Sequence, residues 1–351
     1  MKVLVARTDK IGDVVLSLPV LGYLKERHPD WSVQVLVAPV ALPLVENDPA
    51  VTAIWTYRDE DREILARKLA VERFDAAILL YYHKPLAVLL RKIKVPRRVG
   101  PLSKWSSWLL LNRGVWQQRS RGRRHESEYN LQLAQKLAGT DGAVPEPKIH
   151  LTAGQQQIAR EFRARFAPAG QTVLFVHPGS GGSALNWSPA RYAAVANGLA
   201  ANPRNRVLVT GGPEDAETIT AMSGELESGV EVIAGQNTLR EFLGVLAGGD
   251  CFLGPSTGPL HMAGALGLAV VGLYSPLPTQ SEARWGPRAE THRVISPAVC
   301  CPGRLVCCGE RCRHWNCMDL VTVEAVVTAT NELLQERTDG AVDRSQPTLL
   351  K

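Results

Sequence analysis

Short apolar segments alternate with amphipathic ones along most of this chain, and this alternation is the feature that most limits its fold. In the first half, the apolar segments are KVLVA, SVQVLVA, AIWTY and AAILLYY, at residues 2–6, 32–38, 53–57 and 76–82. A strand that is apolar throughout has to be covered on both faces, which is typical of parallel sheets flanked by helices. The first half therefore predicts a doubly wound α/β domain.

The second half repeats this pattern. Its candidate strands lie within TVLFVHPGS, RVLVTGGPEDAE, VEVIAG, DCFLGPSTG and AVVGLYSP, at residues 172–180, 206–217, 230–235, 250–258 and 269–276. Most of these segments end in residues typical of turns, and open α/β sheets bind ligands at the carboxyl ends of their strands. We therefore expect a second doubly wound domain that faces the first across a cleft.

The alternation weakens between residues 138 and 170, and we place the domain boundary there. The sequence predicts a first domain over 1–165 and a second over 166–325. The amphipathic segment TVEAVVTATNELLQE predicts a C-terminal helix over 322–336, which could pack back on the first domain. The polar residues 337–351 are expected to be disordered.

Length and composition favour a protein of the cytoplasm. The 351 residues are 45% hydrophobic, yet they contain no uninterrupted apolar run of about 18 residues, and the chain begins with a strand segment instead of a signal sequence. Six of the seven cysteines lie between residues 300 and 317, whereas a secreted disulfide framework would distribute them along the chain. We therefore expect a cytoplasmic protein that is at most peripheral at a membrane.

A strongly basic segment extends from Lys84 to Arg124. It contains twelve Lys or Arg, no Asp or Glu, and the tryptophans Trp105, Trp108 and Trp116. Cations interleaved with tryptophan favour a surface that binds anionic lipid or an acidic glycolipid, although a solvated face over core tryptophans explains the same pattern. None of the usual nucleic-acid recognition motifs accompanies the charge, so nucleic acid is not an expected partner.

The most specific motif is GPSTGPLHMAGALG at residues 254–267, where a strand ends and a helix of small residues begins. The free amides of a helix start and the hydroxyls of Ser256 and Thr257 form a natural anion site, and Gly258 lets a phosphate approach closely. His261, in the first turn, can donate to a phosphate oxygen. A plain helix cap with a buried histidine is the structural alternative.

Two further glycine-rich loops are expected at the same sheet edge. HPGSGGSALNWSPARY, at residues 177–192, leaves backbone amides exposed, and Gly-Gly-Pro at 211–213 marks the other loop. Three such loops fit a nucleotide diphosphate. Neither the dinucleotide fingerprint nor the phosphate loop with its lysine is present, which disfavours a dehydrogenase or a kinase.

The first strand runs into ARTDKIGDVVLSLPV at residues 6–20, which places Gly12 and Asp13 at the start of a helix. Nucleotide-binding folds usually have glycines and no acid at this place. The structural explanation is that Asp13 caps the helix, with a charge–dipole attraction of about 0.3–1 kcal/mol.

These motifs occur in the same order in a known family. The chain resembles the bacterial lipopolysaccharide heptosyltransferases from about residue 2 to 335, through RTDKIGDVVLSLPVLGYLK, VHPGSG…NWSPARY, GPSTGPLHMAGALG and CCPGRLVCCGERCRHWNCMDLVTVEAV. The resemblance implies a GT-B fold of two Rossmann-like domains. It also implies an inverting transfer of heptose from ADP-heptose to lipopolysaccharide, without a cofactor or a metal at the reacting centre, on the cytoplasmic face of the inner membrane.

The resemblance also assigns site residues. It makes Asp13 the general base and places Thr257, Gly258 and His261 at the donor diphosphate. The full set of expected donor-binding residues is Ser180, Gly181, Asn186, Trp187, Gly211, Ser256, Thr257, Gly258 and His261. The expected acceptor-binding residues are Lys10, Arg121, Arg123 and Arg124.

Two positions depart from the family pattern. Ser256 stands where some members have an aspartate, and Leu185 stands where many have a lysine poised to neutralise the leaving ADP. Lys10, Arg191 or Arg284 could supply the missing cation. A protein that binds a nucleotide sugar without turnover is therefore an alternative, as is a glycosyltransferase that uses a different nucleotide-sugar donor.

The cysteine-rich segment has two interpretations. Five thiols and His314 offer enough soft ligands for a structural zinc ion, but their spacings are not the paired CxxC of a zinc ribbon. The other interpretation is a loop of reduced or partly disulfide-bonded thiols. The candidate zinc ligands are Cys301, Cys307, Cys308, Cys312 and Cys317.

Overall fold

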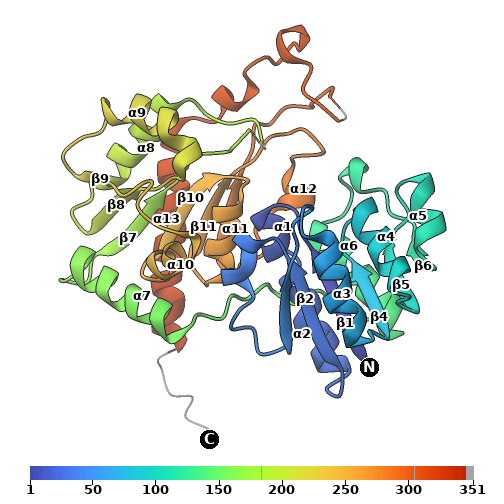
Figure 1. Ribbon diagram of the computed structural model, residues 1–351. Coiled ribbons are helices and arrows are strands. Elements are labelled where there is room, and N and C mark those ends of the chain that lie inside the picture. The colour runs from blue at the N-terminus through green and yellow to red at the C-terminus, as the bar shows by residue number, and fades with distance from the viewer. Residues whose placement is uncertain (183, 304, 345–351) are drawn as a thin grey trace, which may run out of the picture. The chain divides into compact units, whose positions relative to one another are not determined.

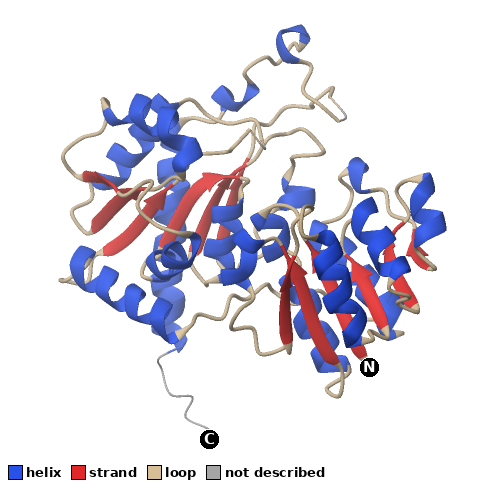
Figure 2. Cartoon of the chain, in the orientation of Figure 1, coloured by secondary structure: helices blue, strands red, loops and turns tan. Residues whose placement is uncertain are grey.

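The computed structural model describes residues 1–182, 184–303 and 305–344 (Figure 1). The chain divides into two compact units, Met1–Thr152 and the part from Ala153 onward. Each unit contains a parallel sheet between helices (Figure 2), which confirms the predicted fold class of two doubly wound α/β domains. No helix in the described part of the chain is long and apolar enough to cross a membrane.

The sheet of the first unit has six parallel strands in the order β3-β2-β1-β4-β5-β6. The strands are β1 (Lys2–Arg7), β2 (Ser32–Val37), β3 (Ala53–Thr56), β4 (Ala76–Leu79), β5 (Arg97–Pro101) and β6 (Arg113–Val115). The helices are α1 (Ile11–Val15), α2 (Leu18–Arg27), α3 (Arg62–Glu72), α4 (Lys84–Lys92), α5 (Trp105–Leu110) and α6 (Glu126–Ala138). Because β1 lies between β2 and β4, the strand order reverses there, and doubly wound sheets bind ligands at such a reversal.

Apolar residues on both faces of β1 explain why its sequence is apolar throughout. Leu4 and Ala6 belong to one core cluster together with Leu69 of α3 and Leu90 of α4. Helices α2 and α6 pack on each other, and they contact β2 and the β5–β6 end of the sheet respectively. The sheet is thus covered by helices on both sides, as the apolar runs predict.

The described part of the second unit has a parallel sheet in the order β12-β11-β10-β7-β8-β9. The strands are β7 (Thr172–Val176), β8 (Asn205–Val209), β9 (Val230–Val232), β10 (Cys251–Pro255), β11 (Ala269–Leu273) and β12 (His292–Ile295). The helices are α7 (Ala153–Phe166), α8 (Pro189–Ala200), α9 (Ala216–Ser223), α10 (Leu239–Ala247), α11 (Gly258–Ala265), α12 (Glu282–Trp285) and α13 (Val323–Arg344).

Helices flank this second sheet as well. Tyr192 of α8 and Val326 of α13 belong to the same core cluster as Val176 of β7. Away from this cluster, α7 packs on α10, and the ring of Phe162 in α7 lies 5.8 Å from that of Phe175 in β7. The second core is therefore built on the same plan as the first.

The structure corrects the predicted domain limits. The division falls after Thr152 and not at residue 165, because α7 packs on α10 and belongs to the second unit. The predicted C-terminal helix is α13, which packs on α8, β11 and β12 within the second unit. The helix continues to Arg344, so the tail predicted to be disordered from residue 337 begins as helix; residues 345–351 lie outside the described ones.

Sequence analysis missed the strands β5, β6 and β12. β5 has the sequence RRVGP and β6 has RGV, so neither shows the apolar run of a central strand. β6 and β12 are edge strands, which need fewer apolar residues because one of their sides has no neighbouring strand.

Candidate active site

The loop after β1 carries the first group of candidate site residues. β1 ends at Arg7, and α1 begins at Ile11 with Lys10 as its N-cap residue in an extended conformation. Asp13 therefore lies in the first turn of α1, inside the helix. Asp13 is thus not the N-cap residue, but its carboxylate lies in the first turn, where the charge–dipole attraction of the structural alternative acts.

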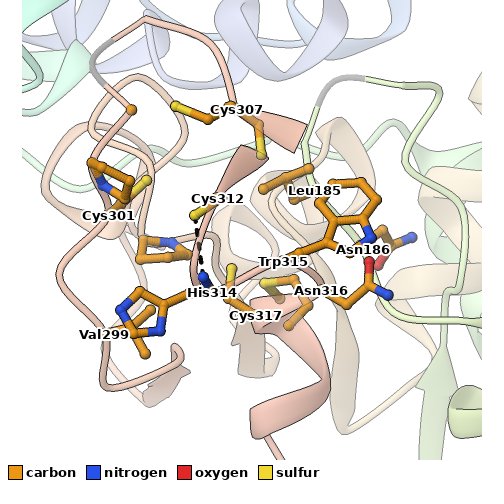
Figure 3. Close-up of a pocket in the computed structure, with 15 residues that line it drawn as sticks. Leu185, Asn186, Val299, Cys301, Cys307, Cys312, His314, Trp315, Asn316 and Cys317 are labelled. Carbon is orange, nitrogen blue, oxygen red and sulfur yellow. Dashed lines mark hydrogen bonds between the residues drawn. The ribbon is translucent and has the colours of Figure 1, made fainter. Parts of the chain in front are cut away.

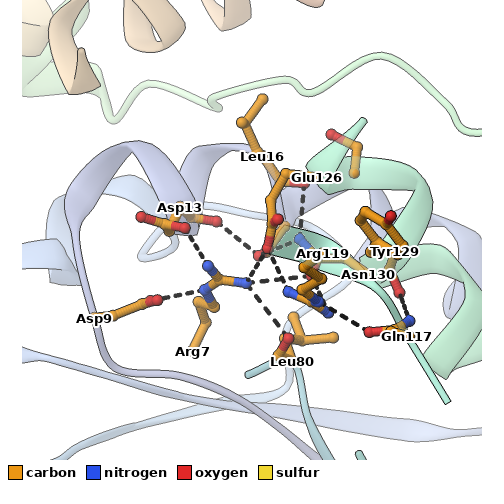
Figure 4. Close-up of polar contacts among 12 residues, drawn as sticks. Arg7, Asp9, Asp13, Leu16, Leu80, Gln117, Arg119, Glu126, Tyr129 and Asn130 are labelled. Carbon is orange, nitrogen blue, oxygen red and sulfur yellow. Dashed lines mark hydrogen bonds and ion pairs between the residues drawn. The ribbon is translucent and has the colours of Figure 1, made fainter. Parts of the chain in front are cut away.

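Arg7 holds the carboxylate of Asp13. The side chain of Arg7 is 4% exposed, and its Nη2 forms an ion pair with Oδ1 of Asp13, whose side chain is 14% exposed. Arg7 Nε donates to Oδ1 of Asp9 at 2.7 Å, and Nη1 donates to Oε1 of Glu126 at 3.1 Å (Figure 4). A planar guanidinium that is bound on several sides cannot rotate, so it fixes the Asp13 carboxylate as well.

A second arginine shares the charge of Glu126. Arg119 Nη1 forms an ion pair with Oε1 of Glu126, and Arg119 Nε donates to Oε1 of Gln117 at 2.9 Å (Figure 4). Asn130 of α6 accepts a hydrogen bond from Arg7 Nη1 at 3.2 Å. We call this set the Arg7 network, and its members are Arg7, Asp9, Asp13, Arg119, Glu126 and Asn130.

The carboxylates keep Arg7 protonated in its buried position. Burial by itself would lower the pKa of Arg7, but the negative charges of Asp13, Asp9 and Glu126 raise the pKa above its usual value. Arg7 is therefore always positively charged in the folded protein, and Asp13 forms an ion pair with it. A carboxylate that is fixed and still partly open can accept a proton from a hydroxyl group within hydrogen-bond distance.

The predicted acceptor-binding residues lie in two segments of the first unit. Lys10 is exposed directly before α1, and the three arginines are exposed at the end of the 3-10 turn Arg119–Arg121 and just after it. These arginines are Arg121, Arg123 and Arg124. Because Arg119 of this turn and Arg7 of β1 both bind Glu126, the Arg7 network ties the two segments together.

Sequence reasoning missed Arg7, Arg119, Glu126 and Asn130. Arg7 and Glu126 are 119 residues apart, so no local spacing reveals their ion pair. One signal was present: an arginine that ends a buried strand has to find carboxylate partners, because an unpaired buried charge is strongly destabilising.

Three loops of the second unit follow the neighbouring strands β10, β7 and β8, and they share one sheet edge as predicted. In the loop after β7, Ser180 is partly buried and Gly181 is exposed. Gly181 and Gly182 have φ of 51° and 69°, a region that glycine enters without strain. Gly211, after β8, accepts a hydrogen bond from the amide of Gly235 at 2.9 Å.

A buried polar group that the sequence analysis missed joins two of these loops. Nδ1 of His177 lies 3.1 Å from Oγ1 of Thr210, and His177 Nε2 lies 3.7 Å from Oδ2 of Asp215. Burial lowers the pKa of His177 to about 4, against the opposite effect of the negative charges of Asp215 and Glu214. His177 is therefore neutral near pH 7 and acts as a hydrogen-bonding group of the framework.

Asp215 also sets the backbone path of both loops. Its Oδ2 accepts a hydrogen bond from the amide of Gly212 at 2.9 Å. A Cβ atom at position 179 would lie 2.1 Å from Cγ of Asp215, so only glycine fits there. This close approach explains one glycine of the predicted phosphate-binding loop.

The third loop leads from β10 into α11 and contains the predicted diphosphate motif. Thr257 is the N-cap residue, and Gly258 is the first residue of the helix. Ser256, Thr257 and Gly258 are partly buried, whereas the side chain of His261 is buried. The loop thus combines hydroxyl groups with the amides of a helix start, a combination that binds anions in other folds.

The side chains of Asn186 and Trp187 form hydrogen bonds within the framework of the second unit, and their contact with the donor stays a prediction. Asn186 Nδ2 donates to the carbonyl of Pro178 at 2.7 Å, and Asn186 Oδ1 accepts from the hydroxyl of Tyr192 at 2.6 Å. Trp187 is 4% exposed, and its Nε1 donates to the carbonyl of Met318 at 2.7 Å. Both side chains hold the loop after β7 in place.

Of the cations expected to replace the missing lysine, Arg191 is engaged elsewhere. Its Nη1 donates to the carbonyl of Val321 at 2.7 Å, and its Nε lies 3.3 Å from Oδ1 of Asp319. Arg284 is partly buried in α12, which follows β11, the neighbour of β10. The replacement of the missing lysine by Arg284 stays a prediction.

The five candidate zinc ligands line one cavity of about 90 Å³, together with Leu185, Asn186 and His314 (Figure 3). Their thiols are all unpaired, and burial raises the pKa of Cys301 and Cys317. Among the described residues, however, no three or more His, Cys, Asp and Glu side chains are arranged to hold a metal ion.

The sequence also matches the model of a known family. The sequence model of glycosyltransferase family 9, described as heptosyltransferase, matches residues 62–305. A Haemophilus influenzae protein provisionally named as a glycosyltransferase is 30% identical over 312 residues, which cover 86% of this chain and 89% of the relative. The lipopolysaccharide core heptosyltransferase OpsX of the same organism is 26% identical over 77% of this chain and 78% of its own.

The fold is also found among solved structures. The Escherichia coli ADP-heptose lipopolysaccharide heptosyltransferase II superposes with a TM-score of 0.80 and 21% sequence identity, covering 96% of this chain and all of that one. This likeness supports the GT-B fold, which consists of two domains of the kind described above.

Proposed function

Because the chain belongs to glycosyltransferase family 9, the heptosyltransferase family, we propose that it transfers heptose from ADP-heptose to the inner core of lipopolysaccharide or to a related surface glycan. The observation that carries this proposal is the ion pair between Asp13 and the buried Arg7 at the carboxyl end of β1. A carboxylate at this place would repel a diphosphate, but it suits the hydroxyl group of an acceptor sugar.

In the proposed reaction, Asp13 is the general base of an inverting transfer. The acceptor hydroxyl gives its proton to the Asp13 carboxylate while its oxygen attacks the anomeric carbon of the donor. The bond from that carbon to the diphosphate breaks on the opposite face, and its electron pair leaves with ADP. This single displacement inverts the anomeric centre, and it uses the carboxylate in place of a metal ion.

Arg7 is a positioning residue in this scheme. It binds Asp9 and Glu126 as well as Asp13, so the three carboxylates share its charge. The Arg7 guanidinium thereby holds Asp13 in a fixed orientation, while Asp9 and Glu126 neutralise part of its charge. Such preorganisation lowers the cost of placing the base against the acceptor hydroxyl.

The loops of the second unit are the proposed donor site. The exposed and partly buried backbone around Ser180, Gly181 and Gly211 offers neutral amide donors to the diphosphate, and Thr257 and Gly258 add the helix start of α11. His261 is proposed to donate to a phosphate oxygen. Arg284 is proposed to stabilise the leaving ADP in place of the lysine that Leu185 replaces.

The acceptor is proposed to be an acidic glycolipid of the lipopolysaccharide type, held at the cytoplasmic face of the inner membrane. Lys10, Arg121, Arg123 and Arg124 are exposed cations on the two segments joined by the Arg7 network. Phosphate and carboxylate groups of a core glycan would pair with such cations. OpsX, a lipopolysaccharide core heptosyltransferase, is one of the relatives that make this acceptor class reasonable.

The experiment incubates the purified chain with ADP-heptose and a heptose-deficient core acceptor, and it measures ADP release. Release that depends on the acceptor supports the proposal. Release with another nucleotide sugar but not with ADP-heptose would favour the alternative donor. Binding of ADP-heptose without release would favour a nucleotide-sugar-binding protein, the alternative that the loss of the lysine at Leu185 raises.

A further inference from the structure

The outward face of α5 in the first unit is apolar. Trp105, Trp108 and Leu109 are 75%, 59% and 63% exposed. Their spacing of i, i+3 and i+4 places them on the same side of the helix, while the residues between them are buried beside α4 and β5. The buried side of the helix carries Ser106, Ser107 and Leu110, so the exposed side is the more apolar one.

Trp116, just after β6, extends this apolar surface. It is 63% exposed, and its ring lies 6.4 Å from that of Trp108. We call Trp105, Trp108, Leu109 and Trp116 the tryptophan face. A single exposed apolar side chain is ordinary, but neighbouring exposed tryptophans mark an interaction surface.

Cations border the tryptophan face. Arg91 Nη1 donates to the carbonyl of Leu109 at 3.2 Å, which places its guanidinium at the edge of the face. Lys104 directly precedes α5, and Arg113 begins β6; both are exposed, and neither forms an ion pair with another described residue. The whole basic segment contains no acidic residue that would neutralise them.

We propose that the tryptophan face docks on the surface of an anionic lipid bilayer. Indole rings prefer the headgroup region, where their apolar body is shielded and their N–H remains hydrated. The bordering cations would then meet lipid phosphates, each adding an attraction that added salt weakens. This inference rests on the proposed function for its lipid-linked acceptor, and it names the surface that brings the protein to that lipid.

The positive charge of the basic segment argues against a second copy of this chain as the partner that covers the tryptophan face. A two-fold interface would bring the same basic segment of both copies together, and their like charges would repel. A free acidic glycan would pair with the cations but would leave the indole rings exposed. An anionic bilayer can pair with the cations and also cover the indole rings.

The experiment measures cosedimentation of the full chain with vesicles of phosphatidylcholine alone and of phosphatidylcholine with phosphatidylglycerol. The double variant Trp105→Ser/Trp108→Ser removes apolar area, and Lys104→Glu/Arg113→Glu reverses the bordering charge. Trp315→Ser is the matched control for an exposed tryptophan, and Lys68→Glu, in the same unit, is the control for an exposed cation. ADP affinity is measured for every variant as a test of folding.

Wild-type protein is expected to bind the anionic vesicles and to lose binding as salt is added. Both double variants should bind at least about tenfold more weakly, while the two controls bind like wild type. Equal binding by wild type and the double variants would overturn the proposal. The proposal would also be overturned if the double variants bound vesicles like wild type but differed from it in oligomeric state. The same holds if they bound vesicles like wild type but no longer bound an acidic protein that wild type binds.

These outcomes are separate from those of the transfer reaction. A protein that transfers heptose to a soluble acceptor but ignores anionic vesicles would keep the proposed function and lose this inference. A protein that binds vesicles through the tryptophan face but releases no ADP would keep this inference and lose the proposed function.

Discussion

The guanidinium of Arg7 and the carboxylate of Asp13 form an ion pair from the end of β1 to the first turn of α1. The two residues are six positions apart, yet the geometry depends on Glu126 at the start of α6, which binds Arg7 from a distant part of the sequence. The candidate base is thus held by the tertiary structure of the first unit. Removal of the base and removal of its support should therefore have different effects.

Asp13→Asn should abolish most of the turnover. The amide keeps the size of the side chain but cannot accept the proton, so kcat should fall by about 100-fold or more. ADP affinity should stay near that of wild type, because the diphosphate is proposed to bind the second unit. Steady-state ADP release and calorimetry check the two expectations. A variant with most of its activity would show that Asp13 is not the base.

Arg7→Met should destabilise the first unit. It leaves the carboxylates of Asp13 and Glu126 without their buried counter-ion, which should lower the free energy of unfolding by about 3–5 kcal/mol. Urea denaturation measures this change. Lys92→Met is the matched control, because the ion pair of Lys92 with Glu63 is 61% exposed on both sides. If both variants lost equal stability, the Arg7 network would have no special role.

His261→Ala and Thr257→Ala should weaken ADP binding. Each removes a donor proposed to face the diphosphate, and the loss of a hydrogen bond to a charged group should cost about 1–3 kcal/mol of binding free energy. Calorimetry with ADP is the measurement. Unchanged affinity in both variants would place the diphosphate away from the start of α11.

Acid should destabilise the second unit through His177. Its pKa is lowered by burial from 6.5 to about 4, so below pH 6.5 the unfolded chain binds a proton that the folded protein does not. The free energy of unfolding should therefore fall as the pH falls from 6.5 to 4, by about 3 kcal/mol in total. Urea denaturation over this range compares wild type with His177→Gln, whose profile should be flatter. Parallel profiles would contradict the buried neutral state of His177.

Arg284→Met should slow the release of ADP. If Arg284 stabilises the charge on the leaving diphosphate, its loss should reduce kcat by about 10- to 100-fold. Arg191→Met is the control, since Arg191 already binds the carbonyl of Val321 and the carboxylate of Asp319. Equal activities of the two variants would leave the missing lysine without a replacement in the second unit.

The central strands of both sheets could be predicted from the sequence because they are buried on both faces. Apart from the ends of β1 and the first residue of β7, the strands β1, β4, β7 and β10 are apolar, so their runs stand out. β5 and β6 could not be found in this way, since arginine and glycine are tolerated near the edge of a sheet. The packing partners of α13 were missed because an amphipathic pattern shows that a helix has an apolar face but not what covers it.

The candidate site was predictable where function depends on local motifs. The glycine-rich loops and the Gly-Asp turn are contiguous in sequence, and the structure places the three loops at one sheet edge. The supporting groups come from residues far apart along the chain, such as Arg7 with Glu126. The packing of Trp187 also had no local signal, because its partner Met318 lies 131 positions away.

The hydrogen bond from Trp187 to Met318 links the C-terminal part of the chain to the proposed nucleotide-binding loop after β7. Met318 comes just before α13, and both belong to the core that supports the loop after β7. A premature stop codon between Arg284 and Met318 would therefore spare every proposed donor-binding residue and still remove the support of that loop. Nonsense mutations in this interval should be as damaging as earlier ones.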